Sequence, residues 1–177
     1  MAYAKLVSRK MKKNTLVPGK NTLWPILSAI FLVSLDQLSK ALIRANFELG
    51  EYLPILGKFF GIDYTQNTGA AFGIFSDGTI FLAILAIIMT LICLGLILYP
   101  HLVPQINNRI GKISIALILA GAMGNLLDRL FLGFVTDWIY LPPIPNFNIA
   151  DSCITIAVFL LLIFIFGPLI LKKEEDV

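Results

Sequence analysis

The chain has 177 residues, of which 58% are hydrophobic and 14% are charged, and its formal net charge is +3. This composition excludes an ordinary soluble domain, because a fold of this size has too little interior to hide so many apolar side chains. It is typical of a protein embedded in a bilayer. The basic excess lies beside apolar runs, so we attribute it to membrane topology, and we predict contact with membrane lipids and no nucleic-acid partner.

Four apolar stretches are long enough to cross a bilayer. A spanning helix needs about 20 mostly apolar residues, since the hydrocarbon core is about 30 Å thick and a helix rises about 1.5 Å per residue. The sequence predicts such helices at residues 23–43, 80–99, 113–132 and 151–171. The predicted fold class is therefore an all-α membrane protein, with one four-helix domain over residues 23–171, a basic tail at 1–22 and a short tail at 172–177.

The distribution of basic residues indicates the orientation of the helices, because positively charged loops stay in the cytoplasm. They lie before the first predicted helix, between the second and third, and after the fourth: Lys5, Arg9, Lys10, Lys12, Lys13, Lys20, Arg109, Lys112, Lys172 and Lys173. Both termini are therefore predicted to be cytoplasmic. The loops at 45–79 and 133–150 contain one basic residue between them, Lys58, and are predicted to face outward.

The first outer loop alternates apolar or aromatic residues with turn formers. Pro54, Gly57 and Gly61 interrupt an otherwise hydrophobic run within residues 48–75. This pattern predicts short strands or an interfacial hairpin, and an aromatic belt at the lipid headgroups is the alternative.

Polar side chains from distant segments fall at one depth, near the outer ends of the predicted helices. They are Asp36, Lys40, Asn125, Asp128, Arg129, Asp137, Asn148 and Asp151. A charge in hydrocarbon costs at least about 2.5 to 3.5 kcal/mol on insertion scales, so such residues normally face the bundle interior and pair or carry function. In a purely structural interpretation, Asp36 pairs with Lys40 one turn away and Arg129 reaches a carboxylate on another helix.

Ion pairing explains Asp137 and Asp151 less well, because the outer loops hold too few basic partners. Two carboxylates that approach each other without a cation tend to share one proton, so that one is a base and the other an acid. Such a pair can activate water against an amide bond. From the residues alone, Asp128 remains an alternative to Asp137 as a member of this pair.

Other nucleophiles and cofactors are less well supported. His101 falls in a predicted inner loop, and Cys93 and Cys153 fall in apolar helices with no histidine at their depth. Asp137 and Asp151 are the residues most suited to hold a divalent metal, but no histidine or cysteine is placed to complete the ligand set. We therefore predict no metal and no cofactor.

Successive short motifs give the chain a family resemblance. It reads DQLSK at 36–40, NTGAAFGIF at 67–75, GAMGNLLDR at 121–129, VTDW at 135–138 and FNIADS at 147–152. In this order the motifs resemble those of the lipoprotein signal peptidases, the bacterial type II signal peptidases, from about residue 35 to residue 159. Each motif is weak alone, but together they cover nearly the whole predicted bundle.

The resemblance implies an aspartic endopeptidase of the bacterial inner membrane that cuts lipid-modified prolipoproteins just before the diacylglyceryl-cysteine. It implies Asp137 and Asp151 as the catalytic pair and an active site that faces outward. It also implies a small extracytoplasmic platform formed by the first outer loop, and we expect a monomer. The residues that it implies as substrate-binding or supporting are Asp36, Lys40, Asn67, Asn125, Asp128, Arg129 and Asn148.

Departures from the family pattern fall beside the predicted catalytic pair. VTDW replaces the commoner VVDF, so Thr136 and Trp138 are expected to change the packing next to Asp137. The proline-rich run LPPIPNF at 141–147 leaves the shape of the second outer loop open.

Two other functions fit a small membrane protein with buried charges. A proton-coupled transporter would use Asp, Lys and Arg as a relay, but the inner halves of the last three predicted helices are almost purely apolar. A structural subunit would use the charges for assembly and would tolerate Asp137→Asn.

Overall fold

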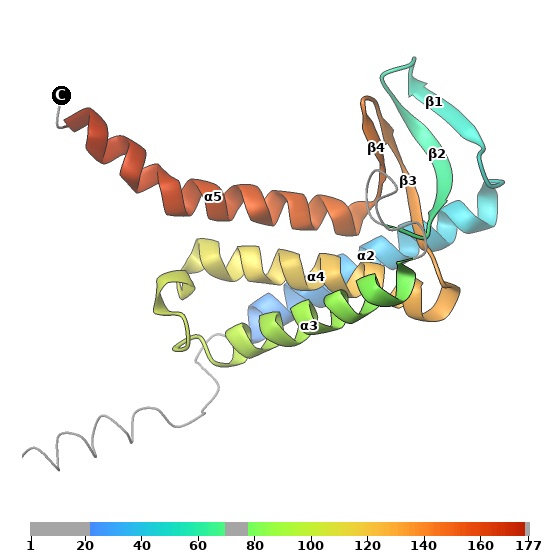
Figure 1. Ribbon diagram of the computed structural model, residues 1–177. Coiled ribbons are helices and arrows are strands. Elements are labelled where there is room, and N and C mark those ends of the chain that lie inside the picture. Colours follow the sequence, from blue (N-terminus) through green and yellow to red (C-terminus); the bar gives the residue numbers. More distant parts are fainter. Residues whose placement is uncertain (1–21, 70–77, 176–177) are drawn as a thin grey trace, which may run out of the picture.

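The computed structural model describes residues 22–69 and 78–175, with side chains up to residue 164. The basic tail predicted before residue 22 and the end of the NTGAAFGIF motif after residue 69 lie outside these residues. Figure 1 shows the elements, which in chain order are α2 (Leu23–Asn46), β1 (Tyr52–Leu56), β2 (Phe60–Asn67), α3 (Thr79–Leu98), the short 3₁₀ helix η2 (Pro104–Ile106), α4 (Arg109–Leu132), β3 (Val135–Leu141), β4 (Ile144–Phe147) and α5 (Ile149–Glu175).

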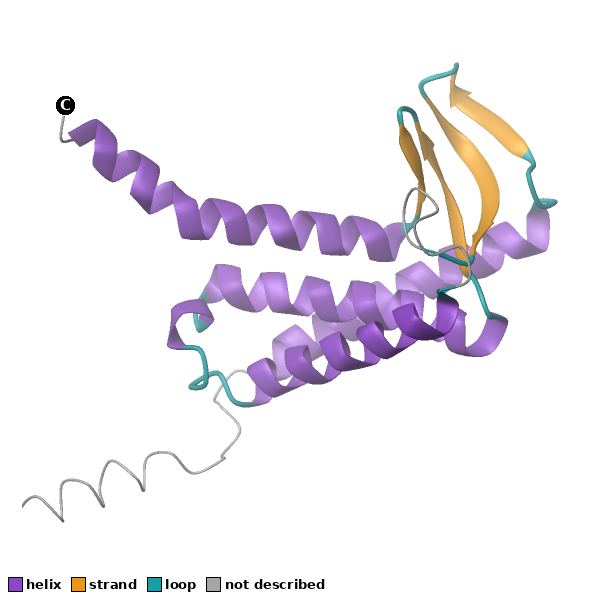
Figure 2. Ribbon diagram, in the orientation of Figure 1, coloured by secondary structure: helices purple, strands orange, loops and turns teal. Residues whose placement is uncertain are grey.

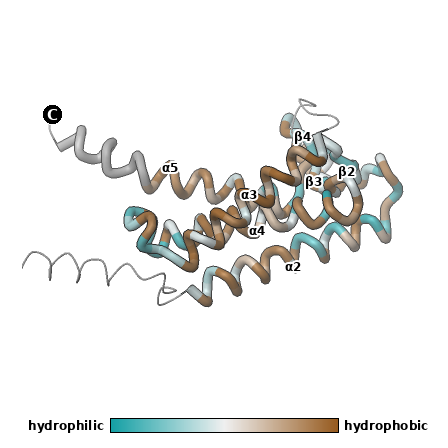
Figure 3. Tube along the Cα trace, turned by 60° about the horizontal axis from the view of Figure 1, so that its bottom comes forward, coloured by the Kyte–Doolittle hydropathy of each residue, from teal (hydrophilic) through white to brown (hydrophobic). Residues whose placement is uncertain are grey.

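The four predicted helices all form, each within a few residues of the predicted limits. Among the described residues, α2, α3 and α4 are long and apolar enough to cross a membrane, and the part of α5 with described side chains, Ile149–Phe164, is a shorter apolar helix. The backbone of α5 continues to Glu175, past the predicted end at residue 171. Large apolar side chains such as Phe31, Ile84 and Leu91 are exposed on the helices, and Figure 3 shows the apolar colour running along them. A helix surface of this kind belongs against lipid.

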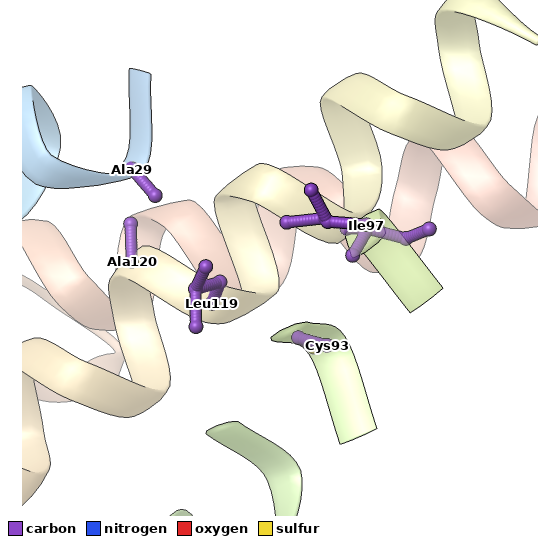
Figure 4. Packing of buried hydrophobic residues seen from close by; sticks show 6 residues of the cluster. Ala29, Cys93, Ile97, Leu119 and Ala120 are labelled. Atoms are coloured by element: carbon purple, nitrogen blue, oxygen red, sulfur yellow. The ribbon is translucent and has the colours of Figure 1, made fainter. Parts of the chain in front are cut away.

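Helix α4 is the central element of the bundle. It packs against α2, α3 and α5, and 61% of its most apolar 18-residue stretch is buried. The core between α2, α3 and α4 consists of Ala29, Cys93, Ile97, Ile115, Leu119 and Ala120, several of which are seen in Figure 4. Because alanines at the contact let the backbones approach closely, α4 can contact all three neighbours.

Toward the sheet, glycines replace side chains in the packing of α4. A Cβ atom added to Gly124 would lie 2.6 Å from Asp36 Oδ2 on α2, and one added to Gly121 would meet the carbonyl oxygen of Ala150 on α5. The helices therefore pack tightly at these two glycines, and this packing brings three helices together at the level of the buried charges.

A small antiparallel sheet, seen in orange at one end of the helices in Figure 2, completes the described fold. Its strand order is β1-β2-β3-β4. The β1–β2 hairpin confirms the strands predicted in the first outer loop. The second hairpin, β3–β4, lies where the sequence predicted a loop at 133–150, and its shape had been left open.

The β3–β4 hairpin forms because β3 finds a partner far away in the sequence. Its sequence, VTDWIYL, is rich in β-branched and aromatic residues, which favour strands. It pairs with β2 in a register that aligns Asp137 with Thr65 and Val135 with Asn67. β4 contains Pro145 but lies at the sheet edge, where a missing N–H group is tolerated.

The turn from α4 into β3 fixes the spacing of the polar residues. Helix α4 ends at Gly133, which has a φ of 81°, a left-handed conformation that glycine adopts without strain. The chain then enters β3 directly. As a result, Asp128 in the last turns of α4 lies close to the start of β3.

Candidate active site

An open cavity of about 910 Å³ lies between the sheet and the ends of α3, α4 and α5 that are nearest to it. One wall is apolar and comes mainly from α3, with Leu82, Leu85 and Met89. The other wall is polar. Of the predicted site residues, those that line the cavity are Asn67, Asn125, Arg129, Asp137 and Asp151.

Asp137 reaches the cavity from β3. Its side chain is 2% exposed, and it accepts hydrogen bonds from Asn67 Nδ2 at 2.9 Å and from Asn148 Nδ2 at 2.7 Å. Burial, and next the negative charge of Asp151, raise the pKa of the Asp137 carboxyl to about 7, although both amide hydrogen bonds and the charge of Lys40 act in the opposite direction. Asp137 therefore retains a proton at pH values where an ordinary aspartate has lost it.

Asp151 is held in the first turn of α5 by the residue that caps this helix. The Asp151 amide donates to Asn148 Oδ1 at 2.9 Å, and the Asn148 amide donates back to Asp151 Oδ2 at 3.2 Å. This is the reciprocal arrangement of a capping box, with an aspartate at its third helical position. The other carboxylate oxygen, Oδ1, accepts a hydrogen bond of 2.7 Å from Asn125 Nδ2.

Asn148 connects the two aspartates. Its side-chain amide donates to Asp137 while its backbone amide donates to Asp151. The same side-chain nitrogen also lies 3.1 Å from Asn125 Oδ1. Asn148 is fully buried, so it sets the relative position of the two carboxylates with little freedom to move.

Lys40 fixes the direction in which the Asn125 amide points. It donates to Asn125 Oδ1 at 2.9 Å, which leaves the amide nitrogen of Asn125 to donate to Asp151. Lys40 is fully buried and forms ion pairs with Asp36 at 2.8 Å and Asp128 at 3.4 Å. The predicted Asp36–Lys40 ion pair is confirmed, and a second carboxylate joins it.

Asp36 and Asp128 lie behind the cavity and hold its parts together. Asp36 Oδ1 accepts a hydrogen bond from the Ala150 amide in the first turn of α5, at 2.9 Å. Asp128 Oδ2 accepts one from the Thr136 amide, also at 2.9 Å, and Asp128 Oδ1 accepts one from Gln37. Each carboxylate thus attaches one aspartate-bearing element to the bundle. The sequence alone left Asp128 and Asp137 as alternatives; in the structure Asp137 lines the cavity and Asp128 does not.

Arg129 differs from its predicted role as an ion-pair partner. In the described part of the chain it forms no ion pair within 4 Å; instead, its Nη1 donates to the Asn125 carbonyl of its own helix at 3.4 Å. Its Nε is buried and has no hydrogen-bond partner among the described residues. Arg129 as a residue also lines the cavity.

Sequence reasoning missed several polar contacts around the site. Gln37 bridges Asp36, Asp128 and the Gly124 carbonyl, although its place next to Asp36 in an apolar helix could have indicated such a role. Arg44 and Thr136 hydrogen-bond to each other, and Asn146 of β4 crosses to β2. Neither of these last contacts carries a local sequence signal, because each depends on the pairing of distant segments.

His, Cys, Asp and Glu side chains do not gather in groups of three or more that could hold a metal within the described residues. Cys93 and Cys153 are buried free thiols, and Cys93 belongs to the core between α2, α3 and α4.

Fold and site together define a class: a protein with several membrane-length apolar helices and two aspartates, Asp137 and Asp151, that line one cavity at the sheet end of the bundle. The profile of the signal peptidase (SPase) II family matches residues 28–167. The chain is 40% identical over 137 residues to the lipoprotein signal peptidase of Moorella thermoacetica. The matched region covers 77% of this chain and 88% of that protein. The chain is 39% identical over 158 residues to that of Streptococcus pyogenes serotype M1, with coverage of 85% and 94%.

A solved structure agrees with these sequence matches. A bacterial membrane enzyme determined by the in meso method at 2.3 Å superposes with a TM-score of 0.74 at 33% identity, over 86% of this chain and 93% of that one. The chain belongs to the signal peptidase II family.

Proposed function

We propose that this protein is an aspartic endopeptidase that removes the signal peptide from lipid-modified prolipoproteins, cutting before the diacylglyceryl-cysteine. The observation that carries the proposal is the pair of carboxylates formed by the buried Asp137 and the half-buried Asp151, which line one cavity and both accept hydrogen bonds from Asn148. The names of the relatives, lipoprotein signal peptidases, supply the substrate class.

In the proposed mechanism, the two aspartates share one proton. The ionised carboxylate takes a proton from water as the water oxygen attacks the scissile carbonyl carbon. The protonated carboxyl polarises the carbonyl oxygen and then gives its proton to the leaving nitrogen, so that the C–N bond breaks. The raised pKa of Asp137 supports this division of labour, because it keeps one proton on the pair near neutral pH.

The substrate-binding role proposed for Arg129 follows from its hydrogen-bond donors. Arg129 lines the cavity, and a guanidinium donor suits a peptide carbonyl or the oxyanion that develops on it. Asn67, Asn125 and Asn148 hold the carboxylates, while Asp36, Lys40 and Asp128 hold the elements that carry them. We propose that the acyl chains lie along the apolar wall formed by α3 and that no metal takes part.

We also propose the membrane arrangement predicted from the basic residues. In it, α2, α3, α4 and α5 all span the bacterial inner membrane within one domain at 23–171, and the tails at 1–22 and 172–177 are cytoplasmic. The sheet and the cavity then lie at the outer face, where a lipid-anchored substrate arrives. We propose that the enzyme is monomeric.

The direct test is cleavage of a diacylglyceryl-modified prolipoprotein by the purified protein in detergent. We expect a product whose new N-terminus is the lipid-modified cysteine, identified by mass spectrometry, and no cleavage of the same precursor without the lipid. A chelator should leave the rate unchanged. No cleavage of the modified precursor by folded protein would refute the proposal, and loss of activity on chelation, restored by a divalent ion, would favour a metal mechanism instead.

A further inference from the structure

Thr136 immediately precedes Asp137 in β3 and is fully buried. Side chains alternate between the two faces of a strand, so the Thr136 side chain points away from the face that carries Asp137. Accordingly Asp137 lines the cavity and Thr136 is outside its lining. The Thr136 side chain therefore cannot touch a substrate in the cavity. Its backbone, however, is joined to that of Asp137, so the position of Thr136 determines the position of the Asp137 backbone.

Three helical segments bind the polar groups of Thr136. Its amide donates to Asp128 Oδ2 of α4 at 2.9 Å, and its carbonyl accepts from Nδ2 of Asn148, the cap of α5, at 3.4 Å. Its hydroxyl accepts a hydrogen bond of 2.8 Å from Nη1 of Arg44, in the last turn of α2. The residue before Asp137 is thus attached to α2, α4 and α5 at once.

β3 depends on these attachments because β4 does not pair with it at Thr136. β4 pairs with β3 at Ile139 and Leu141, beyond Asp137. On the other side, the register with β2 shifts between Ile62 and Thr65, next to the position that aligns with Asp137. Thr136 itself aligns with Gln66 of β2, whereas β4 does not reach it on the other side, and there side chains from the helices take the place of strand contacts.

The contact between Arg44 and Thr136 is the closer of the two that Arg44 makes here. Arg44 Nη1 lies 3.9 Å from Asp128 Oδ1, compared with 2.8 Å from the Thr136 hydroxyl. Asp128 already has Lys40, Gln37 and the Thr136 amide as partners. Balancing the charge of Asp128 therefore does not explain why the guanidinium is placed against the hydroxyl.

We propose that Arg44, acting through the hydroxyl of Thr136, is a positioning residue for Asp137. The proposal rests on the proposed function, in which Asp137 belongs to the catalytic pair. The guanidinium restrains the backbone at Thr136, and this restraint keeps the carboxyl of Asp137 in register with Asp151. A displacement well below 1 Å affects catalysis more than binding, because proton transfer requires closer geometry than substrate contact.

The experiment compares kcat and KM of purified variants on the lipid-modified precursor. Thr136→Val removes the hydroxyl with little change in shape, and we expect kcat to fall about tenfold while KM stays within about twofold of the parent. Thr136→Ser restores the hydroxyl and should restore kcat. Arg44→Met should resemble Thr136→Val, and the double variant should lose no more than the larger single loss, because both changes break one contact.

Thr90→Val is the matched control. Thr90 is also a buried threonine, but its hydroxyl has no hydrogen-bond partner among the described residues, and it lies on α3. This variant should keep the parent's kcat. The folded fraction of each variant is measured by thermal unfolding in detergent, and kcat is referred to folded protein.

Two results separate failure of this inference from failure of the proposed function. If Asp137→Asn is inactive while Thr136→Val keeps the parent's kcat, or if the losses of Arg44→Met and Thr136→Val multiply in the double variant, the positioning role is wrong and the function stands. If Asp137→Asn itself cleaves at the parent's rate, the proposed function fails and the positioning role fails with it.

Discussion

At the scale of single residues, surroundings distinguish carboxylates that look alike in the sequence. Asp128 forms an ion pair with a lysine and accepts hydrogen bonds from a glutamine and a backbone amide. Asp137 instead accepts hydrogen bonds from two asparagine side-chain amides. Amides donate without adding a positive charge, so Asp137 keeps a raised pKa. The donors come from other segments, which is why the sequence alone left Asp128 and Asp137 as alternatives.

The pKa of Asp137 leads to a prediction for the pH dependence of cleavage. Burial and then the charge of Asp151 raise this pKa to about 7. Since the reaction needs one protonated carboxyl in the pair, kcat should fall as the pH rises above about 7, toward tenfold per pH unit. A kcat that stays constant to about pH 9 at saturating substrate would contradict the shared-proton mechanism.

Removing one hydrogen bond to Asp137 tests whether the pKa of this carboxyl controls the pH dependence of kcat. The bond from Asn67 to Asp137 lowers the pKa, because an amide donor favours the ionised form. Asn67→Ala should therefore raise the pKa and move the alkaline limb of the kcat profile to higher pH. A shift to lower pH would show that Asn67 does not act on Asp137 in this way.

At the scale of elements, helix limits followed from the sequence and the second hairpin did not. Apolar runs of spanning length fixed α2, α3, α4 and α5 to within a few residues. β3 and β4 were predicted as a loop, because the prolines of LPPIPNF read as irregular chain and the stabilising partner, β2, lies about seventy residues earlier. Asp137 was therefore assigned to a loop when it lies on a paired strand.

The contact of α4 with α2 and α5 predicts which glycine tolerates a side chain. Gly124→Ala places a Cβ 2.6 Å from Asp36 Oδ2 and 3.0 Å from the Ala150 side chain, so the Lys40 ion pairs must shift. We expect a loss of about 1 to 3 kcal/mol in the free energy of unfolding.

Gly95→Ala on α3 is the control for this substitution. An added Cβ meets nothing within 4 Å there, and alanine favours a helix over glycine by about 0.5 to 1 kcal/mol. Denaturant unfolding in detergent should show this variant to be as stable as the parent or more so. Equal stability of the Gly124 and Gly95 variants would mean that α2 and α4 are not packed closely at the buried charges.

At the scale of the whole molecule, the sequence predicted how the elements are ordered along the bundle. Distant motifs converge at one end because α2 and α4 carry their charges at the same level, and the capping box of α5 adds Asp151 there. The hydrogen bonds at this end could not be predicted from the sequence, because Gln37, Arg44 and Asn146 each contact a helix or strand that is distant in the chain.

The proposed topology predicts which surface positions are reached from outside the cell. Lys58, exposed at the tip of the β1–β2 hairpin, should face outward, and Gln105, exposed in the loop between α3 and α4, should face the cytoplasm. A membrane-impermeant thiol reagent on intact spheroplasts should label Lys58→Cys at once and Gln105→Cys after permeabilisation. The parent should stay unlabelled, because Cys93 and Cys153 are buried. The reverse pattern would invert the topology.

The most direct measurement for the catalytic pair is kcat for Asp137→Asn, Asp151→Asn and the double variant, beside Asp128→Asn, each corrected for folded protein. Each single change in the pair should lower kcat by about a thousandfold or more, and the double variant should lose little beyond that, because the two carboxyls act as one unit. Asp128→Asn should lose stability more than kcat. A folded Asp137→Asn or Asp151→Asn variant that cleaves within about tenfold of the parent would show that the chemistry lies elsewhere.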